Sequence, residues 1–101
     1  MKYPKLVRDF IPRIIEDDGK TCEYHIATLE EYKGFLYKKM QEELDEFIED
    51  PSYDEAADIY EVLRALCSLN LLVMEGVEGV ALEKRLERGA FNDRIILDSV
   101  D

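Results

Sequence analysis

Four acidic residues in the middle of the chain have the types and spacing of a divalent-metal site. They form two pairs, Glu43 with Glu46 and Glu55 with Asp58, and the segment Asp50-Pro51-Ser52 lies between the pairs. Because proline interrupts helices, the stretch predicts two antiparallel helices joined by a short turn. Glu46 and Glu55 lie five and four residues from the proline, so the two pairs should meet at the same level of this hairpin.

The expected position of these acids on the helices also favours a metal site. A helix turns by about 100° per residue, which assigns each residue to a face. The apolar stripes comprise Leu29, Tyr32, Leu36, Met40 and Phe47 in the first helix, and Ile59, Val62, Leu66, Leu69 and Val73 in the second. Glu43 falls inside the first stripe and Glu55 at the middle of the second, while Glu46 and Asp58 border them. Unpaired carboxylates are costly on an apolar face, and no Lys or Arg lies between Met40 and Arg64. We therefore expect Mg²⁺, or Mn²⁺, to neutralise them, since all-oxygen ligation suits these cations.

A structural role for the same acids is the alternative. Ser52 and Glu55 have the spacing of a Ser-x-x-Glu capping box, in which Glu55 stabilises only a helix start. Most glutamates on helices are solvated surface residues. Two pairs in register, each intruding on an apolar stripe, favour the metal site over this alternative.

The remaining elements are predicted to be helical as well. We expect a short helix from Phe10 to Asp17, with Asp9 as its N-cap. Two long helices should follow, one from a Thr28-x-x-Glu31 capping box to about Glu49 and one from about Tyr53 to Met74. A further helix is expected from Val77 to Arg88. Gly19 and Gly89 should end the first and last of these. Lys20 to Ala27 gives a weak signal for a strand or an extended segment, and the tail from Phe91 should be extended or irregular. The predicted fold class is all-α, a helical bundle built on an antiparallel helical hairpin with a short N-terminal appendage.

Size and apolar content bear on assembly. A chain of 101 residues makes one domain, residues 1–101, with a modest core. Leu63 to Val73 is apolar nearly all round, so we expect it to be buried, against another subunit of a homo-oligomer.

Charge and cysteine content restrict the class of protein. The net charge of -11, concentrated in residues 41–83, argues against binding to a nucleic-acid polymer. No run of about 18 apolar residues is present, and the N-terminal Met-Lys-Tyr-Pro-Lys lacks the apolar part of a signal peptide, so we expect no membrane association. Cys22 and Cys67 lie in unlike contexts, which favours free thiols in a reducing, cytoplasmic compartment.

Several stretches together resemble one family. They are Glu42-Glu43-Leu44-Asp45-Glu46 followed by Glu55-Ala56-Ala57-Asp58, Lys5-Leu6-Val7-Arg8-Asp9-Phe10-Ile11-Pro12 near the start, and Lys84, Arg88-Gly89-Ala90-Phe91 and Arg94 near the end. The chain resembles the MazG-like, all-α nucleoside triphosphate pyrophosphohydrolases, and in particular a short single-domain subgroup. It departs from that pattern in a shorter gap between the acidic pairs, and in Ala90 where the subgroup often has a second glycine.

The resemblance implies Mg²⁺-dependent cleavage of a nucleoside triphosphate between its α- and β-phosphates, in a helical dimer or tetramer. The implied metal ligands are Glu43, Glu46, Glu55 and Asp58. Glu42 or Glu46 is the candidate base that orients the attacking water. The candidates for binding the phosphates are Lys5, Arg8, Lys84, Arg88 and Arg94. Two alternatives stay open: a phosphoribosyl-ATP pyrophosphohydrolase, and a non-catalytic helical dimerisation or regulatory module. Neither the base nor the sugar of the substrate is predicted.

Overall fold

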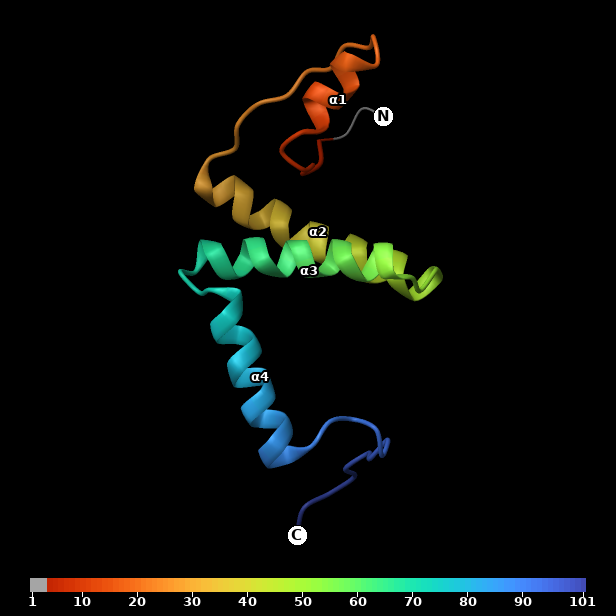
Figure 1. Cartoon of the computed structure of the whole chain (residues 1–101), viewed down its shortest axis with the longest axis vertical. Helices are drawn as coiled ribbons and strands as arrows, with labels where there is room; N and C mark the ends of the chain where they lie inside the picture. The colour runs from red at the N-terminus through yellow and green to blue at the C-terminus, as the bar shows by residue number, and fades with distance from the viewer. Residues whose placement is uncertain (1–3) are drawn as a thin grey trace. The chain divides into compact units, whose positions relative to one another are not determined.

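All regular secondary structure in the described part of the chain is helical. A computed structural model describes residues 4–101. The prediction that no signal peptide is present concerns in part the first three residues, which lie outside the described residues. The helices are α1 (Ile11–Asp17), α2 (Leu29–Glu49), α3 (Tyr53–Leu69) and α4 (Met74–Arg88) (Figure 1). The all-α prediction is therefore confirmed. Of the two possibilities for Lys20 to Ala27, the strand is wrong, because that segment has no regular secondary structure.

The chain divides into two compact units. The first ends at Leu66 and contains α1, α2 and most of α3, whereas the second, Cys67–Asp101, contains the last turn of α3, α4 and the tail. The predicted acidic pairs all lie in the first unit. The expectation of a single domain stays a prediction.

Helices α2 and α3 pack against each other as the predicted antiparallel hairpin (Figure 1). Both starts are capped as expected: Thr28 Oγ1 accepts a hydrogen bond of 3.2 Å from the Glu31 N–H, and Ser52 Oγ accepts one of 3.1 Å from the Glu55 N–H. Helix α2 ends at Glu49, just before the proline turn. These fixed ends set the register in which the acidic pairs face one another.

The apolar stripes of the hairpin largely match the prediction. Leu36 on α2 is 1% exposed, and Val62 on α3 is also buried. Met40 and Phe47 are half-buried, but Leu29 is exposed. Because α2 has 21 residues and α3 has 17, the first turn of α2 has no counterpart to pack against.

The second long helix is shorter than predicted. Helix α3 ends at Leu69 rather than Met74. The Leu72 N–H donates to the Cys67 carbonyl at 2.8 Å and the Leu71 N–H to that of Ser68 at 3.1 Å, which is the hydrogen-bond pattern of a Schellman motif. Leu71 takes the left-handed position of this motif, with φ of 61°. Helix α4 then begins at Met74, earlier than the predicted Val77.

Burial of Leu63 to Val73 against another subunit stays a prediction, and in the single chain the end of this segment is exposed. Leu71 is 93% exposed, and Leu72 and Val73 are exposed as well. The physical reason is the turn after Leu69, since a chain that leaves helical geometry no longer presents its apolar residues on one continuous surface.

Helix α1 ends as predicted but begins differently. The N-cap is Phe10, without a side-chain hydrogen bond, so the prediction of Asp9 as the cap is wrong. At the other end the Lys20 N–H donates to the Ile15 carbonyl at 3.2 Å, and Gly19 has φ of 81°. Gly89, with φ of 83°, is the C-cap of α4, and its N–H donates to the Arg85 carbonyl at 2.8 Å.

No single helix in residues 4–101 has the length and apolar content needed to cross a membrane. Helices α3 and α4 reach that length and composition only when they are counted together as one bent span.

Candidate functional site

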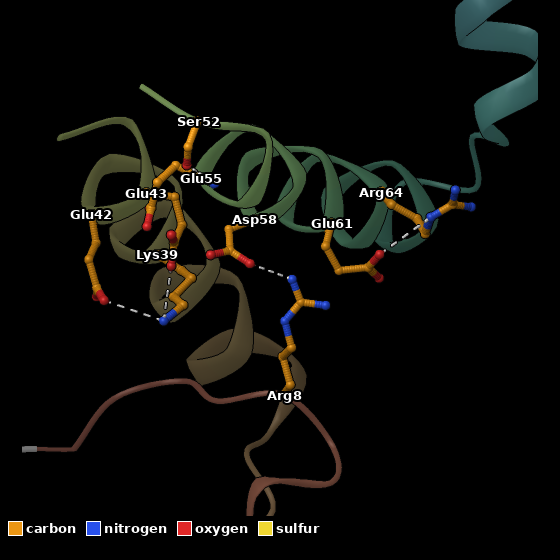
Figure 2. Close-up of polar contacts among 9 residues, drawn as sticks. All are labelled: Arg8, Lys39, Glu42, Glu43, Ser52, Glu55, Asp58, Glu61 and Arg64. Atoms are coloured by element: carbon orange, nitrogen blue, oxygen red, sulfur yellow. Dashed lines mark hydrogen bonds and ion pairs between the residues drawn. The ribbon is translucent and has the colours of Figure 1, made fainter. Parts of the chain in front are cut away.

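The hairpin brings five acidic residues into two overlapping groups. One group is Glu42, Glu43 and Glu46 on α2, and the other is Glu43 with Glu55 and Asp58 on α3. Within each group, one carboxylate oxygen per residue lies within 4.8 Å of the others. Figure 2 shows Glu43, Glu55 and Asp58 close together between the two helices, with Glu42 beside them on α2. Glu43 is common to both groups.

Glu43 is the most enclosed of these acids. Its residue surface is 5% exposed, and its Oε2 atom is buried without a hydrogen-bond partner. Burial raises the pKa of Glu43 above its ordinary value of 4.5; Lys39 lowers the pKa in part, and the neighbouring Glu46 raises it further. A buried carboxylate with a free oxygen is costly unless a ligand engages it.

Glu55 approaches the same place from α3. Its backbone N–H is used by the Ser52 cap, but its side-chain Oε2 is buried and has no partner. The structural role proposed for Glu55 therefore occupies its main chain and leaves this carboxylate oxygen available. Oxygen atoms of this kind, contributed by two facing helices, are donors that Mg²⁺ or Mn²⁺ accepts.

The expectation that no basic residue lies near the acids is wrong. Lys39 Nζ lies 3.3 Å from Glu43 Oε1 and 3.4 Å from Glu42 Oε1 (Figure 2). Arg8 Nη2 lies 2.7 Å from Asp58 Oδ1. Lys39 lies immediately before the interval between Met40 and Arg64, which contains no Lys or Arg. Arg8 reaches the site from the N-terminal segment. The acids are thus partly neutralised by the chain itself.

The two candidate bases differ in their surroundings. Glu42 is half-buried and paired with Lys39, whereas Glu46 is exposed. Glu46 lies with the other acids of α2 and not in the group that contains Glu55 and Asp58. The four predicted ligands are therefore divided between two groups that share Glu43.

The candidate phosphate-binding residues are divided between the two units. Lys5 and Arg8 belong to the unit that carries the acids. Lys84 and Arg88 lie on α4, and Arg94, with φ of 55°, lies in the tail, all in the second unit. A phosphate-binding role for these residues stays a prediction.

Sequence reasoning missed Lys39 as a member of the site. Its signal was present in the sequence, because Lys39 precedes Glu42 by three residues and Glu43 by four, the spacings at which helical side chains meet. The Arg8 pair with Asp58 has no such local signal.

Comparisons with protein-family models, with curated proteins and with solved structures find no match to this chain. The resemblance to the MazG-like family therefore stays a prediction that rests on the motifs themselves.

Proposed function

We propose that this chain is a Mg²⁺-dependent nucleotide pyrophosphohydrolase, which cleaves a nucleoside triphosphate to a monophosphate and pyrophosphate. The observation that carries the proposal is the pair of buried, unpartnered oxygens, Glu43 Oε2 and Glu55 Oε2, in a group that also contains Asp58. Such atoms need a cation or a proton, and carboxylates from facing helices suit a cation.

The proposed chemistry assigns distinct tasks to the residues. The acids would hold Mg²⁺, which would supply positive charge to the phosphate oxygens. Glu43, Glu55 and Asp58 would hold it, with Glu46 contributing through the group on α2. Glu46 is exposed and free of the Lys39 pair, which suits it better than Glu42 to orient a water and accept its proton.

The first experiment is a screen of nucleotides with Mg²⁺ that distinguishes pyrophosphate from phosphate release. We expect pyrophosphate and a nucleoside monophosphate in equal amounts from at least one nucleoside triphosphate. Including phosphoribosyl-ATP in the screen tests the alternative substrate that breaks the same kind of bond. Release of single phosphates would contradict the proposed site of cleavage.

Substitution of Glu55 separates catalysis from capping. Glu55→Gln keeps the backbone N–H that Ser52 caps, so it should cost little stability. An amide oxygen supplies much less negative charge to a cation, so hydrolysis should nearly disappear. Glu49→Gln, which removes a charge from the exposed end of α2 outside both acidic groups, is the matched control and should keep full activity. A Glu55→Gln variant with most of the wild-type activity would overturn the mechanism.

A non-catalytic helical module is the second candidate, and one observation favours it. The pairs of Lys39 with Glu43 and of Arg8 with Asp58 neutralise part of the acidic charge without any metal. A module would tolerate loss of the acids as long as the apolar contacts of α2 and α3 remain. If the wild type cleaves no nucleotide in the screen, this candidate becomes the better one.

We also propose that the chain acts as a homo-oligomer. Few apolar side chains are buried in residues 4–101, whereas exposed ones include Leu71, Leu82 and Leu86. Exposed apolar surface of this kind is typical of interfaces between subunits.

A further inference from the structure

A pocket of about 340 Å³ lies beside the acidic residues in the first unit. Its walls are the N-terminal residues Pro4, Lys5 and Leu6 and, from α2, Phe35, Lys38, Lys39 and Glu42. This volume falls in the range of about 300–1,000 Å³ that is usual for small-molecule sites. Glu42 belongs both to the pocket and to the acidic group of α2, so the two sites adjoin.

The charge of the pocket is opposite to that of the chain. Three lysines and one glutamate line it, although the chain as a whole carries a net charge of -11. Lys38 Nζ also lies 5.4 Å from the centroid of the Phe35 ring, which holds this ammonium over an apolar surface. Ammonium groups gathered in a concave site attract and bind phosphate oxygens.

Lys39 connects the pocket to the acids. Its side chain is 19% exposed, and its ammonium group lies between Glu42 and Glu43 at 3.4 and 3.3 Å. Burial lowers the pKa of Lys39, but the two carboxylates outweigh burial and leave the pKa raised, so the group is charged at neutral pH. Lys39 therefore supplies a positive charge to two of the acids that a divalent cation would otherwise neutralise.

We propose that Lys39 is the counter-ion of Glu42 and Glu43 only until a divalent cation binds these acids and displaces the lysine. The displaced ammonium group of Lys39 then joins Lys5 and Lys38 in binding the polyphosphate end of the nucleotide in this pocket. The inference rests on the proposed metal site and adds a subsite and an order of events to it. Two cations near the same carboxylate oxygens repel each other, so binding of Mg²⁺ weakens the hold of the acids on Lys39. The lysine side chain is long and flexible, and Lys39 already lines the pocket, so its ammonium has only a short path to a phosphate there.

The exchange predicts positive coupling between metal and polyphosphate. Without metal, Lys39 is held by the acids, and only Lys5 and Lys38 are available to an anion. With metal, all three ammonium groups are available. Each ligand therefore strengthens the binding of the other by the same factor.

The first test measures Mg²⁺ binding to the protein without any nucleotide, by calorimetry, and so does not depend on activity. Lys39→Met removes the competing cation and should bind Mg²⁺ roughly fivefold more tightly, the factor expected from loss of an ion pair worth up to about 1 kcal/mol. Lys33→Met removes the same charge from an exposed position of α2 outside the pocket and should match the wild type. Unchanged or weaker Mg²⁺ binding by a folded Lys39→Met variant would overturn the proposal.

The second test measures inorganic pyrophosphate binding with Mg²⁺ in large excess, so that every variant meets the same Mg²⁺–pyrophosphate species. Lys39→Met and Lys38→Met should each weaken binding roughly tenfold, as expected for loss of a charge-assisted contact, and Lys33→Met should not. If Lys39→Met fails to fold, Lys38→Met alone decides this test. A Lys38→Met variant that binds pyrophosphate as tightly as the wild type would overturn the proposal that this pocket binds polyphosphate. Tighter Mg²⁺ binding by Lys39→Met in a protein that cleaves no nucleotide would uphold the exchange and refute the proposed function. Nucleotide cleavage with both tests negative would refute only this inference.

Discussion

Arg8 and Asp58 are joined by an ion pair of 2.7 Å, although fifty residues separate them in the sequence. The pair connects the segment before α1 to α3 and places a guanidinium at the edge of the acidic group (Figure 2). Both side chains are substantially exposed, at 56% for Arg8 and 38% for Asp58. Its contribution to stability should therefore be small, even though the contact is short.

A double-mutant cycle measures that contribution. We expect Arg8→Met, Asp58→Asn and the double variant to give a coupling energy below about 1 kcal/mol in urea unfolding without metal. A coupling above about 2 kcal/mol would show that Arg8 anchors the N-terminal segment rather than remaining available to phosphate.

Metal binding should stabilise the fold. At a Mg²⁺ concentration about tenfold above its dissociation constant, linkage contributes about 1.4 kcal/mol, or a rise of roughly 6 °C in Tm for a chain of this size. Glu43→Gln and Asp58→Asn should remove most of this rise, whereas Glu49→Gln should keep it. A Tm that does not respond to millimolar Mg²⁺ in the wild type would count decisively against the metal site.

The raised pKa of Glu43 predicts how stability depends on pH without metal. Between its ordinary value of 4.5 and its raised folded value, the folded state binds more protons than the unfolded state. The contribution of Glu43 is thus fully present below pH 4.5 and is lost as the pH rises through the folded pKa. As the pH rises above 4.5, the free energy of unfolding in EDTA should fall more in the wild type than in Glu43→Gln. Glu49→Gln should follow the wild type, and equal slopes for all three proteins would contradict the burial of a charged Glu43.

Self-association should be visible by light scattering at micromolar concentration. We expect at least twice the monomer mass, because apolar residues such as Leu82 and Leu86 are exposed in the single chain. Leu86→Glu should lower the mass, and Ser99→Glu, which adds the same charge to the tail, should not. A monomeric wild type would refute the oligomer.

The C-terminal ends of α1 and α3 show which helix ends could be predicted from the sequence. Helices α1 and α3 both end in a Schellman motif, with Gly19 in the left-handed position of the first and Leu71 in that of the second. Glycine in the sequence indicates such a helix end, because it lacks the Cβ atom that makes the left-handed conformation unfavourable for other residues. The end of α1 was therefore predicted correctly. Leucine gives no such signal, so the second helix was wrongly predicted to continue to Met74.

The candidate site shows the same division between local and distant information. The register of Glu43 with Glu55 follows from helical periodicity and a short turn, and the structure brings them into one group. The spacing of Lys39 to Glu42 and Glu43 is equally local, but Lys39 lies just before the interval between Met40 and Arg64 that contains no Lys or Arg. The Arg8 contact with Asp58 depends on how the N-terminal segment folds back onto the hairpin, which no pattern along the sequence specifies.

The exposure of α4 has a consequence for the kinetics of amide hydrogen exchange. Only Met74 among its fifteen residues is buried, and a helix of this length is marginal in water without tertiary support. Its amides should therefore exchange with solvent far faster than those around Leu36 and Val62 in the hairpin. If α4 supplies the surface through which subunits associate, its protection will rise with protein concentration while that of the hairpin core changes little. Dilution would then melt one helix before it disturbs the acidic groups between the other two.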